Sequence, residues 1–240
     1  MSDDLTAAPG KSNAVEDILE VLVAPAKVFD RARNSSPGIY IALLSVLTII
    51  IVFATKGLLT PYIDANFDLQ LQLQAAKGKP IPPEAVAAGR SFGMYGFLAA
   101  SVFTIPMGAL ISGFLIWIGG KLVRADLRFG QAALIATLAS VTRPLSFLAT
   151  AVQGAFADPQ SIRSFADASL GPGRFVDPTT TSPALQGLLA NLDVFNLWQL
   201  VLFAIGISVI ARVSRSTGAI AAIIAWGIGA IATMLPALVT

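Results

Sequence analysis

The chain has 240 residues, of which 55% are hydrophobic and only 12% charged, and its formal net charge is +2. This composition excludes an ordinary soluble domain, because one core cannot hide so much apolar surface, and it predicts a protein covered by lipid. The small net charge without any basic run excludes nucleic acid as a partner, and the lack of Cys and His excludes disulfides, thiolate sites and imidazole metal sites, so we expect no cofactor.

The N-terminal region predicts a polar tail over residues 1–12 and an amphipathic interfacial segment over residues 13–36. Apolar side chains recur there at helical spacing, and the charged ones, Asp17 and Arg31 among them, fall elsewhere on the helical wheel. The apolar positions are Val15, Ile18, Leu19, Leu22, Val23, Ala26 and Phe29. Such a segment packs on the bilayer surface or on a bundle, or docks a partner. Pro25 interrupts the pattern, so we expect two short helices with a joint near residues 23–25.

Five apolar stretches follow, and each reaches or approaches the ~20 residues that an α-helix needs to cross ~30 Å of hydrocarbon. Because a bilayer offers the backbone no hydrogen-bond partners and the stretches do not alternate, they predict helices and not a β-barrel. The fold class is therefore all-α: a polytopic integral membrane protein with five transmembrane helices in a membrane domain over residues 37–240. The expected spans are about 39–58, 92–120, 129–156, 188–211 and 217–239.

Two external loops, 60–91 and 158–186, are expected to join these spans, and both are rich in Pro. Within the first loop, residues 64–76 alternate Leu and Gln, a pattern that formally indicates a strand. Leu, Gln and Ala are good helix formers, however, and an isolated strand has no partner. We therefore predict a short helix that extends from the first span, followed by Pro-rich coil.

Basic residues in short flanks set the expected orientation. With the N-terminus in the cytoplasm, that side carries Lys11, Lys27, Arg31, Arg33, Lys121, Arg124, Arg128, Arg212 and Arg215. The basic residues of the other side lie mostly in the two long loops, where the positive-inside rule counts for little. The pattern predicts a cytoplasmic N-terminus and an external C-terminus.

Arg143 lies deep in the third apolar stretch, where an unpaired charge costs about 2.5–3.5 kcal/mol on insertion scales. At ~1.5 Å per residue it lies ~21 Å from the start of that span, at a depth similar to that of Asp193 at the outer start of the fourth. We predict an intramembrane pair of Arg143 and Asp193, supported by Asn196 and Gln199. The pair is either a clamp between helices or a substrate or ion site. Pro144 is a candidate helix kink.

The sequence carries no catalytic constellation that we can identify. A metalloprotease motif and a serine nucleophile with its base both fail for want of His. Aspartyl chemistry needs two embedded acids, and only Asp193 is near such a position. We therefore expect that the protein is not an enzyme.

The order and spacing of several residues resemble a known membrane family. The matching positions are Pro25 and Phe29 ahead of the first span, Arg128 to Ala132 at the turn into the third, Pro144 within the third, and Asp193, Trp198 and Gly206 in the fourth. Pro25 precedes Phe29 by four residues, and Trp198 follows Asp193 by five. The pattern is similar to that of the Yip family of Ypt/Rab-interacting membrane proteins, in its bacterial form, and covers nearly the whole chain.

The resemblance implies a five-helix membrane fold with a cytoplasmic N-terminus and, for a bacterial member, a place in the inner membrane. Eukaryotic relatives are associated with Rab GTPases, but this chain lacks their long polar N-terminal region, which argues against a Rab-type GTPase as a partner. We expect a non-catalytic scaffold or adaptor whose partners are the lipid bilayer and other membrane proteins or further copies of itself. The alternative is a small transporter or channel component that uses the polar site around Arg143 and Asp193.

Overall fold

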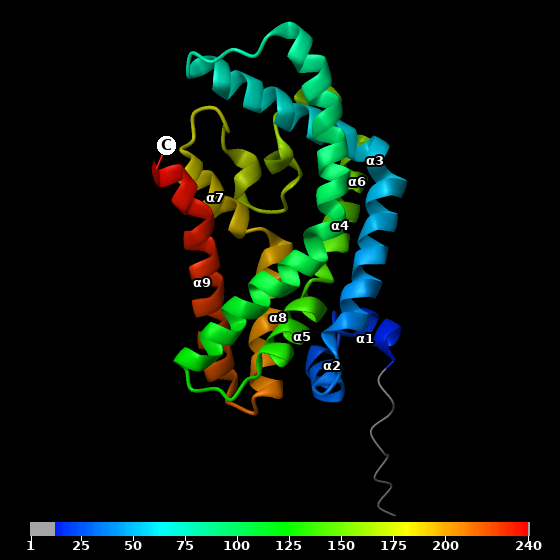
Figure 1. Cartoon of the computed structure of the whole chain (residues 1–240), viewed down its shortest axis with the longest axis vertical. Helices are drawn as coiled ribbons and strands as arrows, with labels where there is room; N and C mark the ends of the chain where they lie inside the picture. The colour runs from blue at the N-terminus through cyan, green and yellow to red at the C-terminus, as the bar shows by residue number, and fades with distance from the viewer. Residues whose placement is uncertain (1–12, 240) are drawn as a thin grey trace, which may run out of the picture.

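A computed structural model describes residues 13–239, with side-chain surroundings up to residue 232, so the expected polar tail at 1–12 lies outside the described residues. The protein is an all-α, polytopic membrane protein, and the described part of the chain contains helices but no strand. Long helices run side by side between two ends of a bundle (Figure 1). We call the end that carries α1 and α2 the N-terminal end, and the end that carries residues 157–182 the loop end.

Helices α1 (Ala14–Glu20) and α2 (Pro25–Ala32) are the two short helices expected from the sequence, and Pro25 begins the second of them. A proline fits at this position because the first backbone N–H groups of a helix have no partner within it. The expected single apolar stripe is divided, however. Ile18 and Phe29 are buried against the bundle, whereas Val15, Leu19 and Val23 are 55%, 66% and 83% exposed.

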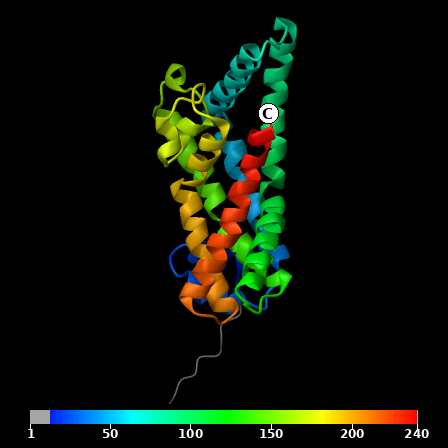
Figure 2. The same ribbon diagram turned by 90° about the vertical axis from the view of Figure 1, so that its left-hand side faces the viewer.

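Four helices in the described residues are long and apolar enough to cross a membrane, and a fifth span exists if the bent pair of α7 and α8 counts as one. The four are α3 (Pro37–Ala76), α4 (Pro83–Leu122), the broken helix α5 (Phe129–Ala139) with α6 (Thr142–Phe156), and α9 (Arg215–Val239). Helix α7 (Pro183–Asn191) meets α8 (Val194–Ile210) at an angle of 58°. Figure 2 shows α9 lying alongside α4 and α8.

The structure differs from the expected loop at 60–91, because α3 continues to Ala76 and α4 begins at Pro83. The good helix formers of residues 69–76 sustain α3, and Gly78, at a φ of 72°, follows its end. The distal part of α3 leans across the loop end (Figure 1), and Pro61, inside the helix, removes one of its hydrogen bonds.

The expected loop at 158–186 contains three short 3₁₀ turns before α7 begins at Pro183. They are η1 (Pro159–Ser161), η2 (Phe165–Ala168) and η3 (Pro172–Phe175). Each of the three begins at a capping Asp or Ser, at a Pro, or at both, and these residue types commonly start short turns. The segment is thus ordered by hydrogen bonds within it and by bonds to Gln153 and Asp193.

Helix α5 occupies the centre of the bundle, since every residue from Ala132 to Ala139 is buried. A helix that is apolar on all sides needs neighbours on all sides, and α3, α4 and α8 supply them. The helix is interrupted at residues 140–141 and resumes at Thr142. Pro144 lies in the first turn of α6, just after this interruption.

Glycines permit the closest helix contacts. A Cβ atom on Gly119 of α4 would lie 2.4 Å from the carbonyl oxygen of Ala221 on α9. A Cβ atom on Gly154 of α6 would lie 2.3 Å from the carbonyl oxygen of Leu58 on α3. No side chain fits at either distance, so both pairs of helices depend on the missing Cβ for their separation.

Candidate functional site

An ionic cluster around the buried Asp17, which we call the N-terminal clamp, joins α1, α2 and α3. Its members are Asp17, Glu20, Lys27, Arg31 and Tyr40. Asp17 is completely buried and accepts hydrogen bonds from the Tyr40 hydroxyl at 2.6 Å and from Nε of Arg31 at 2.8 Å. Nη2 of Arg31 bonds both Asp17 and Oε2 of Glu20, the latter at 2.7 Å, and Nζ of Lys27 lies 2.8 Å from Oε1 of Glu20.

Two members of the clamp, Glu20 and Arg31, have shifted pKa values. Hydrogen bonds from Lys27 and Arg31 hold the pKa of Glu20 below its ordinary value of 4.5. Hydrogen bonds to Asp17 and Glu20 raise the pKa of Arg31. Because breaking a buried ion pair costs about 3–5 kcal/mol, the pair of Arg31 with the fully buried Asp17 makes α1 and α2 a fixed part of the bundle. Sequence analysis missed it, since Asp17 was expected on the polar side of the helix.

Residues of the family pattern meet beside the clamp. Phe29 of α2 is fully buried, and Gly206 of α8 provides the space in front of it. A Cβ atom on Gly206 would lie 2.7 Å from Cγ2 of Ile135 and 3.1 Å from Cζ of Phe29. Pro25 begins the helix that carries Phe29. These three residues dock α2 on α8, whereas Trp198, 38% exposed, lies farther along α8 toward the loop end.

At the other end of the bundle, a cavity of about 470 Å³ lies between the distal half of α3, α6, the loop and the α7–α8 bend. We call it the loop-end cavity. Arg143, Asp193 and Asn196 line it, so the structure brings together three of the four polar residues that the sequence singled out. Gln199 is buried, 8% exposed, and is not among the residues that line the cavity.

The expected ion pair between Arg143 and Asp193 is not formed among the described residues, because Asp193 is engaged elsewhere. Its Oδ1 accepts from the backbone N–H of Phe195 at 2.9 Å and caps α8. Its Oδ2 accepts from the Ser169 hydroxyl at 2.9 Å and from the Leu170 backbone N–H at 2.7 Å. Asp193 therefore fixes the loop to the start of α8, as N-cap residues do, and interacts with Arg143 only through space.

Arg143 is exposed, and its guanidinium makes no hydrogen bond or ion pair with another side chain or carbonyl in the described part of the chain. Ser146 and Thr150 lie three and seven residues farther along α6 and line the same wall of the cavity. Asn66 and Gln70 line it from α3. The spacing of 143, 146 and 150 is a helical signal in the sequence, but Asn66 and Gln70 fell in the expected loop and could not be placed.

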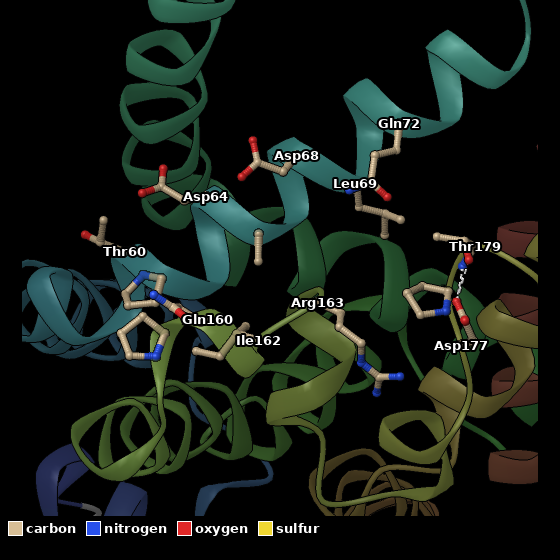
Figure 3. Close-up of a pocket in the computed structure, with 14 residues that line it drawn as sticks. Thr60, Asp64, Asp68, Leu69, Gln72, Gln160, Ile162, Arg163, Asp177 and Thr179 are labelled. Carbon is tan, nitrogen blue, oxygen red and sulfur yellow. Dashed lines mark hydrogen bonds between the residues drawn. The ribbon is translucent and has the colours of Figure 1, made fainter.

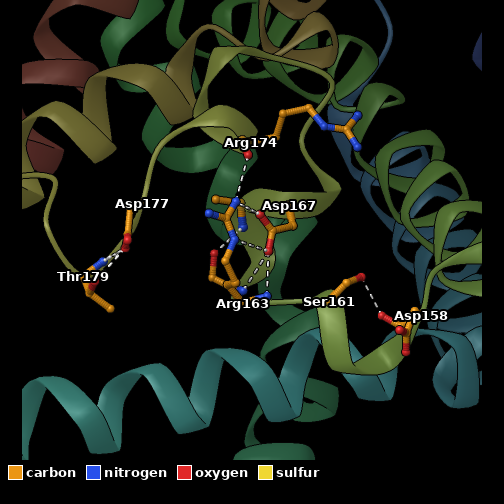
Figure 4. Close-up of polar contacts among 9 residues, drawn as sticks. Asp158, Ser161, Arg163, Asp167, Arg174, Asp177 and Thr179 are labelled. Carbon is orange, nitrogen blue, oxygen red and sulfur yellow. Dashed lines mark hydrogen bonds and ion pairs between the residues drawn. The ribbon is translucent and has the colours of Figure 1, made fainter.

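A second cavity, of about 580 Å³, lies between the distal half of α3 and the loop (Figure 3), and the charged residues that line it are paired or hydrogen-bonded within the fold. Asp64 and Asp68 point away from the loop in this view, and Arg90 of α4 pairs with both, at 3.4 and 2.6 Å. Arg163 binds Asp167 at 2.6 Å and donates to the Arg174 carbonyl at 3.1 Å (Figure 4). These groups hold the loop and the helical hairpin in place.

The chain is similar to known proteins in two comparisons. A family model described as the Yip1 domain matches residues 19–235. The membrane protein YknW of Bacillus subtilis (strain 168) is 22% identical over 229 residues, which cover 95% of this chain and 93% of that protein. No solved structure gives a significant match.

Proposed function

Because the chain belongs to the Yip1 domain family, we propose that it acts in the membrane as a non-catalytic scaffold or adaptor that holds other membrane proteins. The observation that carries this proposal is the fixed N-terminal segment. The N-terminal clamp anchors α1 to the bundle, while Val15, Leu19 and Val23 face outward. A surface that is already ordered loses little conformational entropy when a partner binds.

The outward residues form one apolar edge, which we call the α1 edge. Val15, Leu19 and Val23 are spaced by four residues and are 55%, 66% and 83% exposed. Val15 and Leu19 lie on one side of α1, and Val23 follows in the turn between α1 and α2. The clamp occupies the other side with a charged network, so the edge cannot turn inward without breaking buried ion pairs.

We place the N-terminus, and with it the α1 edge, in the cytoplasm of a bacterial cell, and the loop end outside its inner membrane. The concentration of basic residues in the short flanks of the N-terminal end supports this orientation. The name of the Bacillus relative, a membrane protein, is consistent with that location. Partners of the α1 edge are then membrane proteins with an apolar surface near the cytoplasmic face, or a second copy of the chain.

A photo-crosslinking amino acid at Leu19 tests the proposal in cells. The matched control position is Phe103, which is 62% exposed on α4 but lies in the middle of a membrane span. We expect a discrete protein adduct from position 19 and none from position 103, with the adduct from position 19 lost when the same chain also carries Val15→Ser and Val23→Ser and melts like the wild type. Adducts with lipid alone at both positions would overturn the scaffold proposal.

The loop-end cavity favours a second candidate, a small transporter or channel component. Its supporting observation is the set of polar side chains that converge on the cavity without an ion pair between Arg143 and Asp193. Flux of small organic anions through reconstituted vesicles tests it. Flux above that of empty vesicles, reduced in Arg143→Gln, is the expected result for a transporter, and flux equal to that of empty vesicles would rule transport out.

A further inference from the structure

We infer that the loop-end cavity is a binding site for an oxyanion, a carboxylate or a phosphate, carried by a molecule with an apolar part. The inference deepens the second candidate function, since it names the ligand class for the same cavity. It concerns occupancy and does not require that anything crosses the membrane. The scaffold proposal concerns the opposite end of the bundle.

Arg143 lines the loop-end cavity. A guanidinium keeps its positive charge in proteins and offers five N–H donors in a planar fork. Within the described residues none of these donors is used by another side chain or carbonyl, although the arginine lies within the candidate membrane span Phe129–Phe156. Charged residues at such positions generally pair or mark a binding site. Arg143 therefore presents an unsatisfied cation to the cavity.

The carboxylate of Asp193 lines the same cavity but forms no ion pair with Arg143. Asp193 and Arg143 are the charged residues that line the cavity. Three hydrogen bonds, from Phe195, Ser169 and Leu170, hold the Asp193 carboxylate on the helix start and the loop. Moving it to Arg143 would uncap α8 and release the loop. An external anion meets no such cost.

Neutral hydrogen-bond donors also line the cavity. Ser146 and Thr150 follow Arg143 on the same face of α6, and Asn66 and Gln70 face the cavity from α3. Their side chains, too, have no hydrogen bond with another described residue. Other polar side chains around the cavity are committed: Gln186 donates to two loop carbonyls and Asn196 to the Ala190 carbonyl. Free hydroxyl and amide donors next to a guanidinium are the groups that bind oxyanions.

The wall of the cavity also has an apolar part. Phe147, Phe165, Leu69, Leu73 and Val176 line the cavity together with the donors. A volume of about 470 Å³ falls within the range of ~300–1,000 Å³ that is typical of small-molecule sites. A bare inorganic ion would leave these apolar side chains without a contact. The site therefore fits an amphiphilic anion, either the headgroup region of an anionic lipid or a soluble organic acid with an alkyl chain.

Two probes separate these sources. Protein purified in a neutral detergent is titrated with octanoate by calorimetry, with octanol as the uncharged control. In a parallel arm, protein in phosphatidylcholine nanodiscs with and without phosphatidylglycerol is released and examined by native mass spectrometry for retained lipid. Octanoate binding assigns the site to soluble acids, and retained phosphatidylglycerol assigns it to lipid headgroups. Binding of neither probe overturns the inference.

The variants locate the bound anion. Arg143→Gln removes the charge without breaking an ion pair, and Arg174→Gln is the matched control, at the same end of the bundle but outside the cavity lining. We expect Arg143→Gln to weaken binding about tenfold or more, Arg143→Lys to weaken it less, and Arg174→Gln to bind like the wild type. Equal binding by Arg143→Gln and Arg174→Gln overturns the inference.

A second variant tests the donor wall without changing Arg143, in case Arg143→Gln fails to fold. Ser146→Ala/Thr150→Val keeps Arg143 and the volume of the wall but removes two hydroxyl donors. We expect this variant to bind the probe more weakly, by about threefold to tenfold, and to melt like the wild type. Unchanged binding in a folded variant argues against the donor wall and overturns the inference. Binding without vesicle flux upholds the anion site and rules out transport.

Discussion

The contact between α4 and α9 predicts a large difference between two chemically identical substitutions on one helix. At Gly119, a Cβ atom would lie 2.4 Å from the Ala221 carbonyl oxygen, whereas at Gly108 nothing lies within 4 Å of it. Gly119→Ala must therefore push backbone away from backbone, while Gly108→Ala fills open space. Both residues lie within α4, so the change in helix propensity is shared.

The difference in unfolding free energy between the two variants can be estimated. Replacing Gly by Ala inside a helix favours folding by up to about 1 kcal/mol. Ordinary van der Waals contacts of a Cβ begin near 3.4 Å, so a methyl group at 2.4 Å requires α4 and α9 to separate by about 1 Å or to bend. Overpacking of this kind costs about 1–3 kcal/mol. Because propensity cancels in the comparison, the difference between the two variants is the clash itself, about 1–3 kcal/mol.

Unfolding by sodium dodecyl sulfate in mixed micelles measures the difference. Trp117 on α4 and Trp226 on α9 report the separation of these helices by fluorescence. Gly227→Ala, with nothing within 4 Å of its added Cβ, is the matching control on α9. We expect Gly119→Ala to unfold at a lower detergent fraction than either control. Equal midpoints for Gly119→Ala and Gly108→Ala would refute the close contact.

Three further predictions concern the clamp, the turns and the loop. Asp17→Asn should lower the free energy of unfolding by about 3 kcal/mol, because it leaves Arg31 without its buried partner. The control Asp30→Asn, with a side chain 64% exposed, should change it little. Similar losses in the denaturation midpoints of both variants would contradict a special role for the clamp. Arg124→Gly and Arg212→Gly should each raise stability by about 1 kcal/mol in the same assay, since these arginines have φ values of 59° and 53°, which favour glycine; a loss in both variants would show that the side chains compensate for the strain. Burial alone would raise the pKa of Asp167, but hydrogen bonds from Arg163 outweigh it and hold the pKa below its ordinary value of 3.8. The stability from this pair is thus present above pH 3.8 and lost as the pH falls through the lower folded value, so hydrogen exchange in residues 158–177 should accelerate in that window in the wild type and show no such step in Arg163→Gln.

Those parts of the fold that rest on local patterns could be predicted from the sequence. Continuous apolar runs indicated the membrane helices, and Pro25 indicated the joint between α1 and α2, because each depends on neighbours along the chain. The extension of α3 through residues 64–76 followed from helix propensity. The start of α4 at Pro83 was not predicted, since Pro-rich segments also form coil.

The candidate sites depend on contacts that no local pattern contains. Asp17 was expected on a polar face, and its burial follows from Arg31 and Tyr40, which lie 14 and 23 residues away. Depth along the helices placed Arg143 and Asp193 at a similar level, and in the structure both line one cavity. Depth could not predict whether they pair directly. The Asp193 carboxylate instead accepts hydrogen bonds from Ser169 and Leu170, which belong to a loop with no periodic sequence pattern.

Helix α3 takes part in both ends of the molecule. Tyr40 in its first turn holds the N-terminal clamp, and Asn66, Gln70 and Leu73 near its end form a wall of the loop-end cavity. At ~1.5 Å per residue, about 45 Å of helix separates Tyr40 from Gln70. Pro61 lies between them and removes one hydrogen bond from the ladder, so it is the compliant point of an otherwise stiff rod. A displacement of the first turn of α3 that bending at Pro61 does not absorb moves the wall of the loop-end cavity. One continuous helix therefore connects the two ends of the bundle mechanically.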